Sequence, residues 1–191
     1  MMVEKSSKLR WLLFLPQLPA GNSTARVSLW RQLRSVGVTS ATQGAWILAN
    51  TKRSRAAFAR LSEMSRENGG TAVVFECVTL DGLSDDEIIG RFQADRAREY
   101  DEFETRADRF FAEIEKETKL GKFMFAELEE IEDELEKMRS WLAKINERDF
   151  FPNQRQAHSK QILSACESAF RRFAEKVYEH EQADAAGSPE R

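Results

Sequence analysis

Two short cationic segments carry the residues best suited to chemistry in this sequence. The first follows Ser23 and Thr24, and the second is the run Lys52-Arg-Ser-Arg55. Guanidinium and ammonium groups pair with phosphates and small oxyanions, and the amides at a helix N-terminus add to such a site. The sequence therefore predicts binding of nucleic acid or of a small anion. The candidate residues are Asn22, Arg26, Trp30, Arg31, Arg34, Lys52, Arg53 and Arg55.

The charge of the chain is divided unevenly between its two halves. Residues 1–70 contain eleven Lys and Arg against three acids, whereas residues 71–191 contain eighteen against twenty-nine. The formal net charge of −3 therefore hides a basic module joined to an acidic one. Such asymmetry directs the basic part toward an anionic partner.

Both cationic segments also have a simpler structural explanation. Residues 22–24 precede a predicted helix, where Asn, Ser and Thr commonly act as N-caps, and we favour the cap. A nucleotide triphosphatase loop is disfavoured because the lysine that would reach the phosphates is missing. The cluster 52–55 opens another predicted helix, where positive charge opposes the helix dipole. Three partners could compensate this positive charge: acids of the helical module, phosphates of a nucleic acid, or a small anion. The sequence does not decide between them.

Catalytic and metal-binding residue types are present without the required spacing. A ferritin-type di-metal site needs Glu-x-x-His on two helices, but neither His158 nor His180 has a glutamate three positions earlier. We expect the dense carboxylates to form solvated helix faces and both histidines to lie at the surface. Cys77 falls in a predicted buried strand, where a thiolate is disfavoured. We predict no catalytic residues, no metal site and no cofactor.

The first 80 residues alternate between strand and helix patterns. Strands are predicted over 11–15, 38–41, 45–48 and 71–80, and helices over 25–36 and 52–66. Pro16 is expected to end the first strand, and Val27, Trp30 and Leu33 are expected to form the buried face of the first helix. The order βαββαβ is the ferredoxin-like arrangement, with two helices on one face of an antiparallel sheet.

Long charged helices are predicted from Ser84 onward. Ser84 and Glu87 have the spacing of a capping box. Apolar residues then recur at intervals of three and four in three segments, which Gly121 and the aromatic corner 149–153 separate. The seam residues are Tyr100, Phe103, Ala107, Phe110 and Ile114; Leu128, Ile131, Leu135, Met138, Leu142 and Ile145; and Leu163, Cys166, Phe170, Phe173 and Val177. Heptad spacing predicts helices packed with a left-handed twist, here an antiparallel bundle of three.

The predicted fold class is therefore α+β, with a basic ferredoxin-like module over 1–80, an acidic helical module over 81–182 and a disordered tail over 183–191. The apolar run 11–15 is too short for a membrane span. Because Pro16 ends this run after five residues, it is also too short for the hydrophobic region of a signal peptide. Two cysteines indicate a reducing compartment. We expect a cytoplasmic protein without a membrane partner. Sheet edges and helical seams leave a homodimer open.

Several blocks of the sequence together carry a resemblance to a known family. They are Leu12–Pro19, Arg26–Arg34 with Gly37, Gln43–Leu48, Arg96–Phe103 and Arg148–Pro152. Over residues 9–180 the sequence resembles the N-terminal domain of ChrB-type chromate resistance proteins. The first 80 residues also resemble the ferredoxin-like domain of PaaX-type transcriptional repressors, which agrees with the fold derived above.

The resemblance implies a chromate-responsive regulator or accessory protein of a chromate efflux operon. DNA is then the expected partner, and chromate is the candidate effector. The positions that carry over are Arg26, Trp30, Arg31, Arg34, Gly44 and Trp46. PaaX-type repressors have a winged helix-turn-helix before this domain, which the residues before Trp11 are too few to form, so DNA contacts are expected from the basic module. Longer chromate regulators have a further C-terminal domain, so effector sensing by this chain stays open.

Two other classes of function stay open. A non-enzymatic adaptor or oligomeric scaffold would hold its partner with the heptad helices and the aromatic corner. An enzyme is favoured least, either a nuclease on the ferredoxin-like module or a thiol-dependent chromate reductase using Cys77. The predicted strands lack an acidic residue placed for a metal nuclease.

Overall fold

The computed structural model describes the backbone of residues 9–187 and the side chains of residues 9–183. The chain divides into two compact units, the first comprising Met1–Asp95 with Arg148–Phe151 and the second Arg96–Glu147 with Pro152–Arg191. The boundary lies after Asp95 and not after residue 80, because apolar side chains that follow residue 80 pack in the first core. The last four residues of the predicted tail lie outside the described residues.

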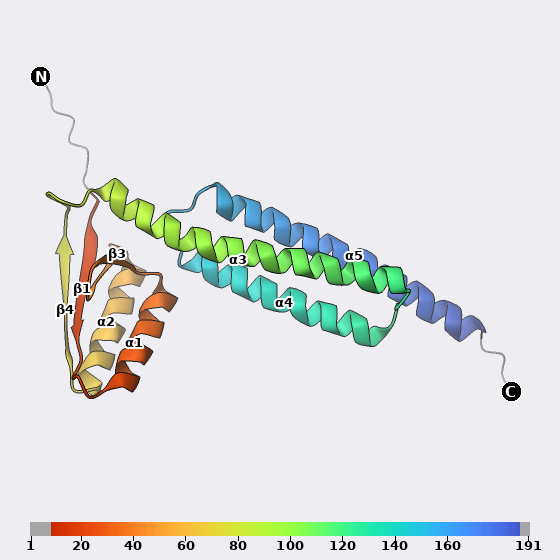
Figure 1. Ribbon diagram of the computed structural model, residues 1–191, viewed down its shortest axis with the longest axis horizontal. Helices are drawn as coiled ribbons and strands as arrows, with labels where there is room; N and C mark the ends of the chain where they lie inside the picture. Colours follow the sequence, from red (N-terminus) through yellow and green to blue (C-terminus); the bar gives the residue numbers. More distant parts are fainter. Residues whose placement is uncertain (1–8, 188–191) are drawn as a thin grey trace, which may run out of the picture. The chain divides into compact units, whose positions relative to one another are not determined.

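The first unit is built on a four-stranded sheet with strand order β2-β3-β1-β4, in which every neighbouring pair is antiparallel. Helices α1 and α2 cover the same face of this sheet (Figure 1). This order and the helix placement confirm the predicted ferredoxin-like arrangement. The elements are β1 (Trp11–Gln17), α1 (Ser23–Val36), β2 (Thr39–Thr42), β3 (Ala45–Ala49), α2 (Lys52–Glu67) and β4 (Thr71–Cys77).

Strand β1 runs through Pro16, so the prediction that this proline ends the strand was wrong. The pairing of β1 with β3 covers Trp11 to Phe14, whereas its pairing with β4 continues to Gln17. Pro16 therefore lies where β4 is the one paired neighbour of β1. A residue without an amide proton is tolerated at such an edge-like position.

The two faces of the sheet are covered in different ways. On the helix side, Phe14 of β1 stacks on Phe58 of α2 with ring centroids 4.9 Å apart. On the other side, the ring of Trp11 lies 6.1 Å from that of Phe92 and 5.8 Å from that of Phe151. The indole N–H of Trp11 also donates to Asp85 Oδ1 at 2.8 Å. The aromatic corner predicted between two bundle helices thus supplies part of the core of the first unit.

Helix α1 buries a different face from the one predicted. Its buried residues are Ala25, Leu29, Leu33 and Val36, which lie along one side of the helix at intervals of four and three. Val27 and Trp30, predicted to be buried with Leu33, are 48% and 47% exposed. Leu29 occupies the position against the core that Trp30 was expected to fill.

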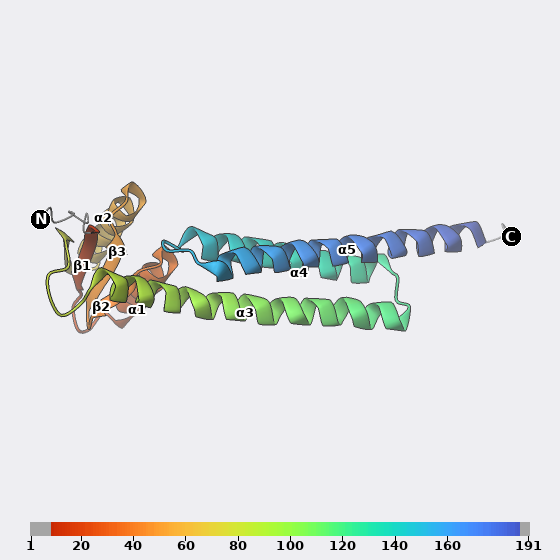
Figure 2. The ribbon, with the colours of Figure 1, turned by 90° about the horizontal axis from the view of Figure 1, so that it is seen from above.

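The second unit contains most of α3 (Asp85–Leu120), together with α4 (Phe125–Glu147) and α5 (Gln154–Gly187). Figure 2 shows these helices side by side. All six predicted seam residues of α4 are buried, as are Tyr100 and Phe103 of α3 and Cys166 and Phe173 of α5. The heptad pattern therefore identified the core of the bundle correctly. Among the described residues, no helix has an apolar stretch long enough to cross a membrane.

The predicted capping box starts helix α3. The amide and the hydroxyl of Ser84 donate to Glu87 Oε2 at 2.7 and 2.8 Å, and the amide of Glu87 donates to Ser84 Oγ at 3.2 Å. The Ser84 amide, as the main cause, lowers the pKa of Glu87. Reciprocal bonds of this kind satisfy the unpaired amides at a helix start.

Candidate nucleic-acid interface

Helix α1 is held at both ends by residues suited to those positions. The Asn22 side chain accepts a hydrogen bond from the Ala25 amide at 3.0 Å, which makes Asn22 the N-cap. Gly37 ends the helix in the left-handed conformation at φ 87°, which glycine adopts without a steric penalty. The structural explanation of Asn22 is therefore confirmed, and its side-chain oxygen is engaged with the helix it caps.

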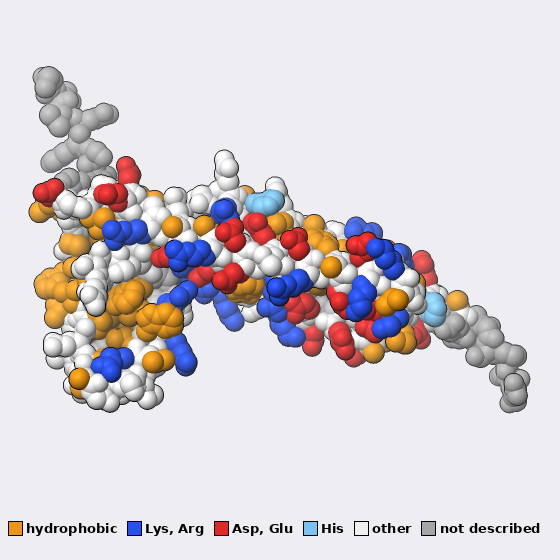
Figure 3. Space-filling model, viewed as in Figure 1, with side chains coloured by type: hydrophobic (Ala, Val, Ile, Leu, Met, Phe, Trp, Pro, Cys, Tyr) orange, Lys and Arg blue, Asp and Glu red, His pale blue; other side chains and the backbone are white. Residues whose placement is uncertain are grey.

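The exposed side of α1 carries four of the predicted site residues. Arg26, Trp30 and Arg34 are four residues apart and form one row, and Arg31 lies beside it. The Arg34 guanidinium lies over the Trp30 ring, 5.1 Å from its centroid. We call Arg26, Trp30, Arg31 and Arg34 the α1 basic face. In Figure 3, basic and hydrophobic side chains are visible over α1.

The helix that carries the α1 basic face contains no acid of its own. The 14 residues of α1, Ser23–Val36, include no Asp or Glu. In the part of the chain that the structure describes, Arg26, Arg31 and Arg34 form no ion pair with a carboxylate. Three guanidinium groups are thus exposed without compensation, an arrangement that attracts an anion.

The second cationic segment is arranged differently. Thr51 caps α2 by accepting a hydrogen bond from the Ser54 amide at 3.0 Å. Arg55 then binds one oxygen of Glu76 at 2.8 Å, while Arg10 binds the other at 2.7 Å. These bonds, first that from Arg10, lower the pKa of Glu76. The compensating partner of Arg55 is thus an acid of β4, which is none of the three partners left open by the sequence.

Lys52 and Arg53 lie exposed in the first turn of α2.

Sequence reasoning missed two further residues at these surfaces, Arg10 beside Glu76 and the exposed Val27 on α1. The antiparallel pairing of β1 with β4 brings Arg10 close to Glu76. That contact was not visible in the sequence, because the register between β1 and β4 was unknown. A helical projection that placed Leu29 on the buried side of α1 would have placed Val27 on the exposed side.

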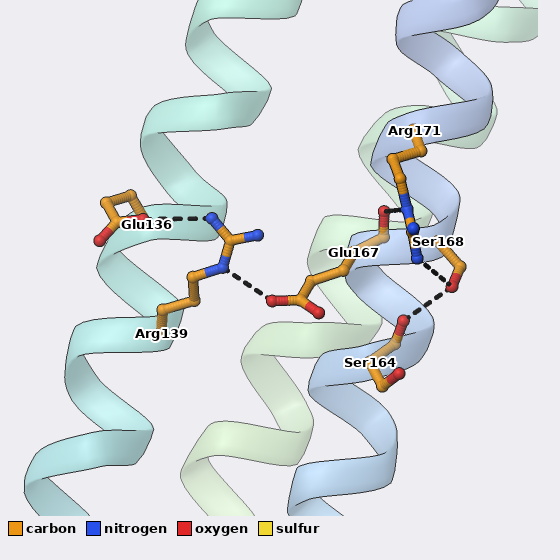
Figure 4. Close-up of polar contacts among 6 residues, drawn as sticks. All are labelled: Glu136, Arg139, Ser164, Glu167, Ser168 and Arg171. Carbon is orange, nitrogen blue, oxygen red and sulfur yellow. Dashed lines mark hydrogen bonds and ion pairs between the residues drawn. The ribbon is translucent and has the colours of Figure 1, made fainter.

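In the second unit, Arg106 and Arg139 bind acids of a neighbouring helix. Arg106 of α3 donates to both oxygens of Glu134 of α4, at 2.5 and 2.9 Å. Arg139 of α4 bonds Glu136 at 3.2 Å and Glu167 of α5 at 2.8 Å, as Figure 4 shows. Arg106 and Arg139 therefore already have anionic partners inside the bundle, unlike the arginines of the α1 basic face.

Both cysteines lie where ionisation of the thiol is disfavoured. Cys77 is half-buried, and desolvation raises the pKa of its thiol. Burial raises the pKa of Cys166 to about 11. Both shifts oppose formation of the nucleophilic thiolate. Among the described residues, no three or more His, Cys, Asp and Glu side chains come together as they would to hold a metal ion.

The family model described as "Protein ChrB, N-terminal" matches residues 26–184. A curated protein named Protein ChrB, from Cupriavidus metallidurans, is 31% identical over 98 residues, which are 51% of this chain and 30% of that protein. The chain thus matches less than a third of the length of that relative. No solved structure matches the chain. Because the family model spans most of the sequence, the chain belongs to the family of ChrB N-terminal domains.

Proposed function

We propose that this chain takes part in chromate resistance as a transcriptional regulator that binds DNA through the α1 basic face and responds to chromate. Family membership supports the link to chromate resistance. The observation that carries the DNA-binding role is the exposure of three arginines on one helix without an acidic partner among the described residues. The closely spaced phosphates of DNA are anions that such a surface attracts.

The dimensions of α1 suit the major groove of DNA. A helix of 14 residues is about 21 Å long at 1.5 Å per residue, and the major groove admits an α-helix. Arg26, Arg31 and Arg34 would pair with phosphates or with guanine edges. Trp30 is 47% exposed and would pack against sugars or bases between these contacts.

Chromate would act on the same surface as a competitor or from another site as an effector. Like phosphate, it is a tetrahedral oxyanion, and guanidinium groups bind such oxyanions through charge-assisted hydrogen bonds. Simple competition would be shared by sulfate, which has the same shape and charge. An effector would release DNA at a chromate concentration at which sulfate has no effect.

Fluorescence anisotropy with a labelled duplex from the region upstream of the chain's own gene tests this proposal. We expect binding that weakens steeply with salt, that falls for Arg31→Ala and Arg34→Ala, and that chromate but not sulfate reverses. Lys144→Ala removes an exposed cation of α4 and is the matched control, expected to bind as the parent does. Binding that does not depend on salt, or equal losses in Lys144→Ala and Arg34→Ala, would contradict the proposal.

The adaptor alternative is weakened by the burial of its proposed contact surface. Leu135 and Met138 of the heptad seam are fully buried in the bundle. A partner could contact them only if the bundle opened. The α1 basic face, in contrast, is exposed as it stands.

A further inference from the structure

Strand β4 lies at the edge of the sheet and exposes apolar side chains there. Within residues 9–187, β4 pairs with β1 alone, so its outer edge has no paired strand. Its three central residues Val73, Val74 and Phe75 are 47%, 39% and 51% exposed. Hydrophobic side chains also gather at the left margin of Figure 3, where Figure 1 places β4.

The edge of β4 lacks the features that normally prevent strand pairing. Proteins protect exposed edges with lysines, prolines, bulges or a covering element. The sequence of β4, TAVVFEC, contains neither lysine nor proline, and its pairing with β1 is regular over seven residues. Its one charge, Glu76, is already paired with Arg10 and Arg55 of the same chain. A second strand could therefore add to this edge without burying an unpaired charge.

We propose that two copies of this chain associate by antiparallel pairing of their β4 strands about a two-fold axis at Val74. In that register Val74 faces the partner's Val74, and Phe75 faces the partner's Val73. Directly opposed residues of an antiparallel pair lie on the same face of the sheet. The two sheets become one continuous sheet, and the β4 edge of each copy becomes paired.

The sequence of β4 selects this register over its neighbours. An axis at Phe75 would place Val74 opposite Glu76, and an axis at Val73 would place Phe75 opposite Thr71. The axis at Val74 is the one that pairs each exposed central apolar residue with another apolar residue. Glu76 then faces Ala72, so the two glutamates do not face each other.

The apolar surface beside the edge extends the proposed interface. Leu13 and Leu15 of β1 pair with Phe75 and Val73 in the sheet and so share their face. Leu15 is itself exposed. Pairing of two copies would bring two such apolar surfaces together across the axis. Self-complementarity of this kind characterises a two-fold interface and identifies a second copy, rather than an unrelated strand, as the occupant.

The oligomeric state of the full chain in the absence of DNA tests the proposal independently of DNA binding. Size-exclusion chromatography with light scattering is expected to give about twice the 22.0 kDa mass of one chain. Val74→Lys and Val74→Glu should each reduce the mass to that of one chain, because the substituted residue meets its own copy across the axis. An equimolar mixture of the two variants should recover the doubled mass, since the opposite charges then face each other.

Leu80→Lys serves as the control, because it also replaces an exposed apolar residue by a cation but lies outside β4. It should keep the parent mass. Circular dichroism should show the helix and strand content of the parent in each variant, and recovery in the mixture would show that both remain competent to pair. A parent chain of single mass, or a Val74→Lys variant that retains the doubled mass, would overturn the proposal.

Discussion

Two sets of arginines, one in each unit, differ in what they contact. In the first unit, Arg26, Arg31 and Arg34 lie exposed on a helix without acids. In the second, Arg106 and Arg139 bind glutamates of neighbouring helices. Exposed ion pairs of the second kind contribute about 0–1 kcal/mol each, so they add modestly to the fold. The comparison teaches that a cation with an acid close by is held in an ion pair, whereas the arginines of α1, a helix without acids, stay available to an outside anion.

The cores of the two units also differ in origin. The bundle core follows a regular heptad repeat within α3, α4 and α5. The core of the first unit joins strands and helices to Phe150 and Phe151, which are distant in the sequence. One core can be deduced from local spacing, whereas the other depends on long-range contacts.

Leu135→Ala should have the largest effect on stability. Leu135 is fully buried at the centre of the bundle, and removal of a buried leucine side chain costs about 2–5 kcal/mol. Denaturant unfolding measures the change. The control Glu132→Ala shortens an exposed side chain of the same helix and should have little effect. If Leu135→Ala left stability unchanged but altered association, the seam would be a partner surface and the adaptor alternative would gain support.

Gly37→Ala should have an intermediate effect that reports on the segment 148–151. A Cβ at residue 37 would lie 2.6 Å from Arg148 Cβ and 2.7 Å from its carbonyl oxygen. Gly44 also has a positive φ, of 76°, but has open space around it. Both substitutions should lower the free energy of unfolding by about 1–2 kcal/mol, because alanine is strained in the left-handed conformation. Gly37→Ala should lower it further because its Cβ also clashes with Arg148.

Unfolding of the two glycine variants under identical conditions gives this difference directly. A larger loss in Gly37→Ala would show that Arg148 packs against the end of α1 in solution. Equal losses would mean that the segment does not occupy this position, and the division of the chain into its two units would need revision.

Glu76→Gln should have the smallest effect, one that depends on pH. Its hydrogen bonds with Arg10 and then Arg55 lower the pKa of Glu76 in the folded state below its ordinary value. The stabilisation is therefore present above the ordinary pKa and is lost as the pH falls through the lowered one. The parent should be more stable than the variant at neutral pH, and the difference should shrink in acid. Thermal unfolding across that range measures it, with Glu67→Gln as the control for loss of one charge.

A difference between the parent and Glu76→Gln that stayed constant or grew on acidification would contradict the ion pairs of Glu76. The same experiment reports on the ion pair of Arg55 and not on the α1 basic face. Arg55 contributes to the stability of the first unit through Glu76, whereas Arg31 and Arg34 have no such role in the described contacts.

Much of the fold could be predicted because its signals are local. The heptad spacing of α4, the capping box at Ser84 and Glu87, and the alternation of strand and helix patterns each depend on residues close in sequence. The structure confirms all three. The α1 arginines were likewise named as candidates from the sequence, and the structure places them on the exposed side of the helix.

The rest depended on contacts between distant residues. Trp30 was assigned to the core because spacing alone did not show that Leu29 packs there instead. The pairing of Glu76 with Arg10 and Arg55 required the register between β1 and β4. The contribution of Phe151 to the first core required the tertiary fold. Local patterns give each element, but they do not give the neighbours of its side chains.

The salt dependence of DNA binding tests the central claim most directly. We would compare the parent with a variant in which Arg26, Arg31 and Arg34 are changed to Gln, and with a control in which Lys137, Lys144 and Arg172 of the bundle are changed to Gln. A plot of log K against log salt loses about 0.9 of slope for each phosphate contact removed. The account predicts a flatter slope and weaker binding for the α1 variant, with the bundle variant unchanged. Equal slopes for the α1 variant and the parent would contradict it.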